Sequence, residues 1–326
     1  MPDKAAKKAA HVVRESRIPA ELAGQRFDLA LARLYPEYSR SRLTRWIKEG
    51  HALLDEKPAR PRDAVMDGQR VRLTVVEEPL TGVAPEDLPL HIVYEDAALI
   101  VVNKPAGLVV HPGAGNRAGT LQNALLHHAP ELAKLPRSGL VHRLDKDTSG
   151  LLAVARTLES HTHLVAALQA REFEREYTAL VNGVMTGGGT VDAPLGRHAT
   201  DRLRMSVREG GREAVTHYRV LKRFRAHTQV AVQLETGRTH QIRVHLAHIR
   251  YPIVGDPVYG RRLALPPGAT PRLNEALQGF RRQALHARRL GLVHPVSGEH
   301  MHWEAPLPAD MRELVAALED DLAHAR

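Results

Sequence analysis

The sequence contains no cysteine, which excludes a disulfide scaffold, thiol catalysis and zinc sites with thiolate ligands. Aromatic residues are also scarce, with four phenylalanines, two tryptophans and seven tyrosines, too few for a single-strand binder built on stacking platforms. The longest apolar run, 97–102, is far shorter than the roughly 20 residues of a membrane-spanning helix. No apolar stretch follows the N-terminal lysines, so we expect no secretory signal and a cytoplasmic location.

What the chain does have is basic charge and enough apolar residues to fold. Lys and Arg number 46 against 37 Asp and Glu, a net charge of +9. The pI of about 10.0 favours a polyanionic partner, although many basic proteins bind no nucleic acid. At 326 residues and 43% apolar content, the chain is long enough for one large domain or two unequal ones.

Composition changes along the chain predict its organisation. A tail rich in Lys and Ala opens the chain, and the segment EEPLTGVAPEDLP, with three prolines and four acids, has no usable periodicity. Strand-like runs mixed with isolated helices, without a βαβ rhythm, predict an α+β fold with a largely antiparallel sheet. We therefore expect a flexible tail, a small α/β module, a linker and a large domain, at residues 1–15, 16–76, 77–89 and 90–326.

The densest cluster of polar residues lies at 139–150, directly before the apolar run LLAVA. Here Asp145 and Asp147 are interleaved with basic residues, so the loop can hold a carboxylate rigidly beside cations. The alternative is an ordinary charged turn, because DKDTSG is good turn chemistry by itself. Two carboxylates two residues apart also permit a glycosidase-type pair, provided that they point to the same face.

A second cluster, at 235–248, combines arginines and histidines. Its apolar spacing predicts a helix after Gly237, with Arg238, His240 and Gln241 in the first turn. Without an acid after the first residue, this edge is suited to an anion, and RNA phosphate is the expected partner. Three histidines also raise the question of a metal site, but the HExxH spacing and an accompanying carboxylate are missing, so we expect none.

The remaining fragments carry weaker signals. The glycines of 111–120 miss both phosphate-binding spacings, so no nucleotide cofactor is expected. By itself, Tyr177 at the start of a strand is typical of packing, and 255–260 is typical of a tight turn.

Taken together, these motifs resemble those of the RluA-type pseudouridine synthases. The order and spacing agree over about residues 18–318, and the matching segments are NKPAGLVVHPG (103–113), HRLDKDTSG (142–150), REYTALV (175–181), LETGRTHQIRVH (234–245) and VGDPVYG (254–260). In addition, YSRSRLTRWIKEG (38–50) resembles the S-four-type RNA-binding module that many members carry.

The resemblance implies a pseudouridine synthase fold and the isomerisation of uridine in RNA, with base flipping and without a metal or nucleotide cofactor. Asp145 would be the essential catalytic group, either attacking the sugar or removing a ribose proton. A buried carboxylate needs a compensating cation. We expect Arg238 to be that partner, with Arg243, a helical position expected to face elsewhere, as second candidate.

The resemblance also implies how RNA is bound. Tyr177, expected to be a catalytic residue, would stack on the uracil and handle the C5 proton, and Arg143 would fill the gap left by the flipped base. The other expected RNA contacts are His142, Arg243, Arg40, Arg42, Arg45 and Lys48. The implied partner is large-subunit (23S) ribosomal RNA, at the helix 69 stem-loop, or a pre-large-subunit particle, bound by a monomer without a membrane.

Two other functions stay open at this point. A noncatalytic ribosome-assembly factor would share the charge and the RNA-binding module, yet would not need Asp145, Arg143 and Tyr177 together. A glycoside or nucleoside hydrolase could use Asp145 with Asp147, although the basic helix argues against a neutral sugar.

Overall fold

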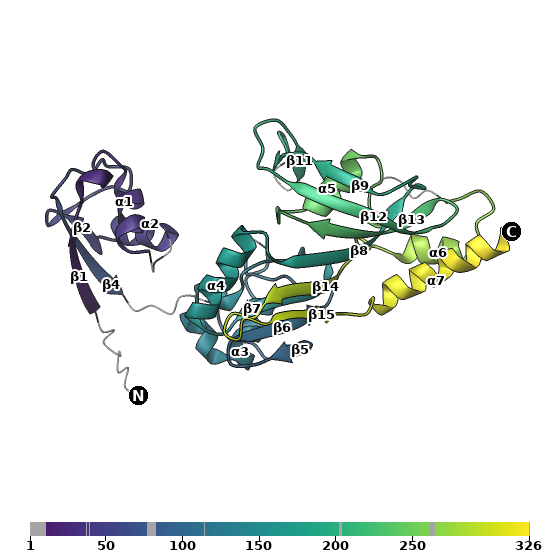
Figure 1. Ribbon diagram of the computed structural model, residues 1–326, viewed down its shortest axis with the longest axis horizontal. Helices are drawn as coiled ribbons and strands as arrows, with labels where there is room; N and C mark the ends of the chain where they lie inside the picture. The colour runs from purple at the N-terminus through teal and green to yellow at the C-terminus, as the bar shows by residue number, and fades with distance from the viewer. Residues whose placement is uncertain are drawn as a thin grey trace, which may run out of the picture. The chain divides into compact units, whose positions relative to one another are not determined.

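The computed structural model describes residues 11–36, 38, 40–76, 83–113, 115–201, 204–260 and 265–325. The chain divides into two compact units, at 1–81 and 82–326. Figure 1 shows both units, which are described separately below. Within the residues listed above, no helix is both long and apolar enough to cross a membrane.

Unit 1 is a four-stranded antiparallel sheet with two helices (Figure 1). The strand order is β1-β4-β2-β3, and the elements are β1 (His11–Arg17), β2 (Ala52–Leu54), β3 (Lys57–Pro58), β4 (Arg70–Val76), η1 (Ala20–Leu22), α1 (Phe27–Leu34) and α2 (Arg40–Lys48). Phe27 and Leu31 of α1 and Trp46 of α2 are fully buried and form its core. Because β1 begins at His11 and pairs with β4 along its whole length, the tail expected over 1–15 is wrong from His11 onward.

Unit 2 is built on a nine-stranded mixed sheet. The strand order is β5-β6-β7-β14-β8-β13-β12-β9, with β15 also paired to β14. The strands are β5 (Ile92–Glu95), β6 (Leu99–Lys104), β7 (Ser149–Ala155), β8 (Glu174–Asn182), β9 (Gly189–Asp192), β12 (Val215–Arg223), β13 (His227–Leu234), β14 (Leu285–Val293) and β15 (His300–Glu304). Only β7 and β14 are parallel among these pairs, which confirms the predicted α+β class with a largely antiparallel sheet.

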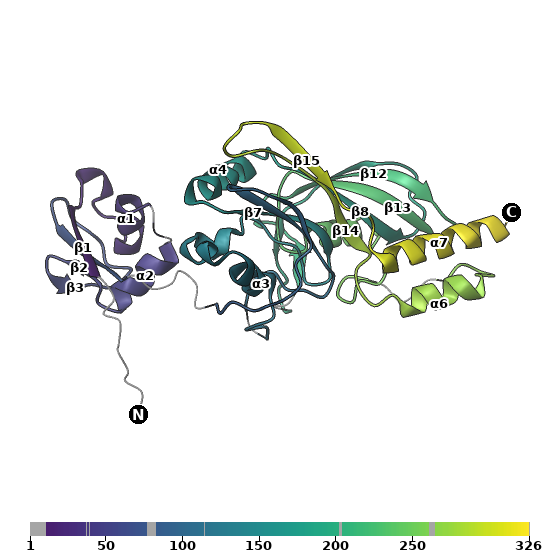
Figure 2. The same ribbon diagram turned by 90° about the horizontal axis from the view of Figure 1, so that it is seen from below.

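Helices cover this sheet, and a small ribbon lies beside it (Figures 1 and 2). They are α3 (Leu121–His128), α4 (Leu158–Gln169), α5 (Gln241–His248), α6 (Pro271–Gly279) and α7 (Ala309–His324), with short turns η2 (Pro130–Lys134) and η3 (Pro136–Gly139). The ribbon pairs β10 (Leu195–Arg197) with β11 (Met205–Val207). Alternate residues of β7 pack toward α3 and α4, so this strand is apolar and buried on both faces.

The expected linker differs from the structure in its second half. Residues 77–82 lie outside the described residues, whereas 83–89 belong to unit 2. The side chain of Asn123 donates to the carbonyl oxygen of Ala84 at 2.8 Å, and the carboxylate of Glu86 accepts from the backbone of Gly119. These long-range hydrogen bonds fix a segment whose composition indicates a free connection.

Gly150 sets how closely the two parallel strands approach. It has a φ of 115°, and a Cβ there would lie 2.2 Å from the carbonyl oxygen of Ala287 in β14. Any other residue would therefore push β7 away from β14. Since the loop with Asp145 runs directly into β7, this contact also positions the loop.

Candidate active site

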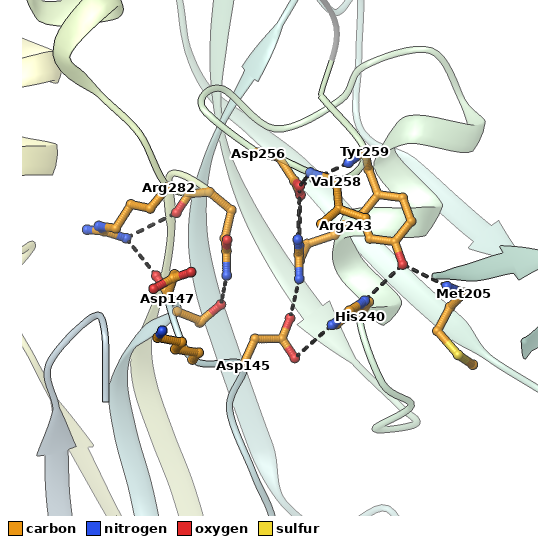
Figure 3. A network of polar contacts seen from close by, with 12 residues as sticks. Asp145, Asp147, Met205, His240, Arg243, Asp256, Val258, Tyr259 and Arg282 are labelled. Atoms are coloured by element: carbon orange, nitrogen blue, oxygen red, sulfur yellow. Dashed lines mark hydrogen bonds and ion pairs between the residues drawn. The ribbon is translucent and has the colours of Figure 1, made fainter. Parts of the chain in front are cut away.

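Asp145 lies in the loop that leads into β7, and its carboxylate faces α5. Its Oδ2 accepts a hydrogen bond of 3.0 Å from Nη1 of Arg243 (Figure 3). The predicted partner, Arg238, instead donates from Nε to the carbonyl oxygen of Glu213 at 3.1 Å. The first expectation for the ion pair is therefore wrong, and the second candidate, Arg243, is the partner.

The residue at which α5 begins explains why Arg243, and not Arg238, pairs with Asp145. The helix begins at Gln241, not directly after Gly237. The Gln241 side chain accepts from the backbone N–H of Arg238 at 3.0 Å and is buried, which closes the turn before the helix starts. Arg238 consequently precedes the helix. Arg243 lies in its first turn and points into the protein, where it is 4% exposed.

A second carboxylate, that of Asp256, binds the edge of the Arg243 guanidinium that does not contact Asp145. Asp256 binds it through two hydrogen bonds, to Nε at 2.7 Å and to Nη2 at 2.9 Å (Figure 3). The backbone N–H groups of Val258 and Tyr259 donate to the same carboxylate at 2.9 and 3.0 Å. Burial would raise the pKa of Asp256, but the hydrogen bonds and charge of Arg243 lower it overall. Burial likewise opposes the charge of Arg243, yet its two carboxylates raise its pKa. The geometry fixes the guanidinium in one orientation.

His240 and Tyr259 form a second connection to Asp145. Nε2 of His240 lies 3.8 Å from Oδ1 of Asp145, and its Nδ1 is hydrogen-bonded to the Tyr259 hydroxyl at 2.8 Å. His240 has left-handed backbone geometry, with φ 57°. Burial lowers its pKa, and the charge of Asp145 opposes this shift. The imidazole therefore lies next to the carboxylate and is oriented by the hydroxyl of Tyr259.

The backbone of the Asp145 loop is anchored by two basic side chains. Lys104, at the end of β6, is 1% exposed and donates from Nζ to the carbonyl oxygens of Pro105, Leu108 and Lys146 at 2.8–2.9 Å. Burial lowers its pKa to about 7. Arg282 donates to the carbonyl oxygen of Asp147 at 3.1 Å. Both contacts restrain the residues that follow Asp145.

A cavity of about 490 Å³ opens in front of Asp145. Asp145, Arg143, His142, Tyr177, Arg238 and Arg243 all line it, so the structure brings together every residue predicted for the site in unit 2. Tyr177, from the central strand β8, is 6% exposed, and burial raises its pKa. Arg137, Arg171 and Arg175 add further positive charge to the walls. The cavity thus combines the carboxylates of Asp145 and Glu235 with the aromatic side chain of Tyr177 and an excess of cations.

Comparison with known proteins identifies this arrangement. Residues 98–248 match the family described as RNA pseudouridylate synthase. The chain is 58% identical over 313 residues, 96% of its length and 95% of the relative's, to "Ribosomal large subunit pseudouridine synthase D" of Xanthomonas campestris. The chain belongs to the RluA-type family of pseudouridine synthases. It is an RNA pseudouridine synthase, an isomerase that converts uridine in RNA to pseudouridine.

Other relatives agree with this assignment. The Pseudomonas aeruginosa protein of the same name is 56% identical over 95% of this chain and 97% of its own length. Among solved structures, "Human RNA Pseudouridylate Synthase Domain Containing 4" matches with a TM-score of 0.55 and 28% identity, over 70% of this chain and 93% of its own. The pseudouridine synthase fold expected from the motifs is confirmed.

Two predicted RNA contacts are corrected by the geometry of this synthase. His142 accepts on Nε2 from the backbone N–H of Ala153 at 3.0 Å, and burial lowers its pKa to about 3. It is therefore a neutral residue that supports the loop and offers no charge to phosphate. Arg243 is buried between Asp145 and Asp256, so its guanidinium is committed to the protein. Arg143, by contrast, is exposed and has no hydrogen-bond or ion-pair partner among the described residues.

The basic residues expected to bind RNA from unit 1 lie on α2 and differ in their surroundings. Arg40 pairs with the buried carboxylate of Asp28 at 2.8 Å. The Arg42 guanidinium stacks 4.5 Å from the centre of the Trp46 ring. Arg45 and Lys48 are exposed, and Arg45 lies 3.9 Å from Glu49.

Sequence reasoning missed several residues of the site. By itself the segment 255–260 predicts a tight turn, and the family motif at 254–260 predicts no role for Asp256 or Tyr259 individually. Lys104 lies in the matching segment 103–113, for which the sequence patterns predict no role of its own. The available signal was a lysine directly after an apolar strand, a position at which a charge is buried only if its donors find acceptors.

Proposed function

We propose that this enzyme isomerises specific uridines of large-subunit (23S) ribosomal RNA, at the helix 69 stem-loop, acting in the cytoplasm as a monomer. The names of its relatives support large-subunit ribosomal RNA as the substrate. One observation carries the chemistry: the Asp145 carboxylate lies 3.0 Å from a guanidinium that is itself fixed by a second carboxylate. Such preorganisation suits a carboxylate that must attack the sugar or remove a ribose proton.

The other cavity residues are assigned to substrate binding. A paired uridine must leave its stack before it can reach a cavity of this kind, at a cost of a few kcal/mol. Arg143 is exposed at the cavity. Its planar, always charged side chain can fill the gap that the flipped base leaves in the RNA stack, and it can also bind phosphate. Tyr177 offers an aromatic face to the flipped base.

Unit 1 is proposed to be an S-four-type RNA-binding module. Its support is the motif at 38–50 and the exposed cations Arg45 and Lys48 of α2. Arg40 and Arg42 pack against Asp28 and Trp46, so we assign them to shaping this surface. Phosphate contacts of this kind strengthen binding without reading sequence.

Tritium release tests the proposal. Large-subunit RNA labelled at C5 of uracil loses tritium to water when the glycosidic bond moves to C5. Wild-type enzyme should release it, whereas Asp145→Asn, which keeps the size but removes the charge, should release none. Sites of conversion are then mapped on the same RNA. Release by both proteins would discard Asp145 as the catalyst, and binding without release, on naked RNA and on intact subunits, would favour an assembly factor.

A further inference from the structure

Arg175 is a buried cation that has no counterion in the described part of the chain. It lies in β8 and is 9% exposed. Among the described residues its Nε has no hydrogen-bond partner, and Nη2 donates only two long hydrogen bonds, to the carbonyl oxygens of Leu234 and Glu235 at 3.4 and 3.3 Å. Among the described residues, no carboxylate lies within ion-pairing distance of its guanidinium. Burying a charge in this way is costly, so a group that is not part of the chain should complete it.

The surroundings of Arg175 keep it available. The nearby carboxylate of Glu235 is already bound by Arg171 and His217, each at 2.7 Å. A Cβ at Gly237 would lie 2.9 Å from Nη1 of Arg175, so the glycine leaves room for the guanidinium. Arg243, the other buried arginine of the cavity, has two carboxylates instead. The two arginines therefore differ in what they are left to bind.

Arg175 is also aimed at the place where the base should lie. It is two residues before Tyr177 in the same strand, and side chains two apart point to the same face of a sheet. Both side chains line the cavity in front of Asp145. A base stacked on Tyr177 would therefore lie beside the Arg175 guanidinium.

The reaction develops negative charge on that base. Conversion of uridine to pseudouridine breaks the bond between C1′ and N1, and the electron pair of that bond leaves with the uracil. The ring anion spreads this charge over N1, O2 and O4 until C5 supplies the pair for the new bond to C1′. C5 then loses one proton and N1 gains one, so the isomerisation balances without any co-reactant.

We propose that Arg175 is a further catalytic residue, which contacts a carbonyl oxygen of the detached uracil and stabilises its negative charge. This rests on the proposed function, because it concerns the same cavity and the same RNA substrate. A fixed cation placed where charge develops stabilises the transition state more than the ground state. A backbone phosphate is the rival ligand. It is disfavoured because it is already charged in solvent and would have to be buried to reach a side chain that is only 9% exposed.

The test compares uridine with 5-fluorouridine at the target position of the RNA. Fluorine withdraws electrons and stabilises the uracil anion without help from the protein. The readout is single-turnover loss of the target nucleoside, measured by nuclease digestion and chromatography, since fluorine prevents loss of a C5 proton. We expect Arg175→Gln to slow conversion of uridine by about 10²–10³-fold and of 5-fluorouridine by much less, with RNA affinity unchanged.

Two further variants serve as controls. Arg175→Lys keeps the charge without the planar fork and should recover part of the rate. Arg289→Gln removes an arginine of β14 whose Nε is likewise buried without a partner, outside this cavity, and should leave the rate unchanged. If Arg175→Gln does not fold, the comparison of the two substrates is made with Arg175→Lys.

Three results would overturn the inference. The first is an equal loss of rate on both substrates. The second is weaker RNA binding with a salt dependence reduced by about one phosphate contact, which would assign Arg175 to phosphate. The third is an unaffected rate in Arg175→Gln. An inactive wild type would overturn the proposed function as well, whereas each of the three results requires an active wild type.

Discussion

Replacing Asp256 by Asn should separate stability from catalysis at this site. Asp256 does not line the cavity, and its side chain is fully buried behind Arg243. The amide keeps one oxygen for the backbone N–H groups of Val258 and Tyr259, but its NH₂ group cannot accept from the guanidinium. Arg243 then keeps Asp145 as its partner through a single hydrogen bond of 3.0 Å.

The structure sets the expected magnitude. Removing one partner of a buried ion pair costs about 3–5 kcal/mol of unfolding free energy, and we expect the lower end because Asp145 still pairs with Arg243. Asp145→Asn should cost only about 1 kcal/mol, since Arg243 keeps its bidentate partner and Asp145 is 16% exposed. In catalysis the order reverses. Asp145→Asn abolishes activity, whereas Asp256→Asn lowers the single-turnover rate about a hundredfold by letting the guanidinium move.

Urea unfolding followed by tryptophan fluorescence measures the first quantity. The chain has two tryptophans, Trp46 in unit 1 and Trp303 in unit 2. In a Trp46→Phe background the signal of Trp303 therefore follows unit 2 alone. The reasoning is refuted if Asp145→Asn destabilises unit 2 as much as Asp256→Asn does, or if Asp256→Asn converts uridine at the wild-type rate.

Two more outcomes follow from charges elsewhere in the chain. His227 is fully buried, and burial lowers its pKa to about 4, below the value of about 6.5 in the unfolded chain. Stability should therefore fall as pH drops from about 6.5 to 4, by up to about 1.4 kcal/mol per pH unit, and urea titrations of His227→Leu should lack this share of the slope. In unit 1, Arg45→Glu with Lys48→Glu should weaken RNA binding and reduce the log–log salt slope by about 0.7–0.9 per lost contact. An unchanged slope in filter binding, with unit 1 still folded, would contradict the phosphate assignment.

The sequence was sufficient to predict a carboxylate beside cations in the loop at 139–150, but not to identify the ion-pair partner of Asp145. Charged residues between two apolar segments indicate a rigid carboxylate, and periodicity indicates the helix that follows. Periodicity does not show where that helix begins, however. The start depends on the buried side chain of Gln241, which donates from Nε2 to the carbonyl oxygen of Val215 and to the hydroxyl of Thr216, 26 and 25 residues away. Because α5 begins at Gln241, after Arg238, the arginine that faces inward is Arg243.

The same limit applies to the segment expected as a linker and to the turn at 255–260. Prolines and acids indicate a segment without helix or strand, which holds for the described part, 83–89, but the hydrogen bonds of Ala84 and Glu86 join residues more than 30 positions apart. Asp256 is 13 residues from Arg243, and the pair forms only because β8 and the segment after α5 lie side by side. Local patterns contain no information on such contacts.

Four arginines around Asp145 fall into two groups by their partners, and this division predicts what each of them does. Arg243 and Arg282 are bound to carboxylates or backbone carbonyls, and with Lys104 they fix the Asp145 loop in place. Arg143 and Arg175 have no carboxylate partner among the described residues and line the open cavity. A cation that is already neutralised orients the catalytic group but adds little attraction for RNA, whereas one without a counterion gains its full electrostatic stabilisation only when substrate binds. Substitutions in the first group should therefore disturb geometry and stability, and those in the second should disturb substrate binding or the developing charge while leaving the fold intact.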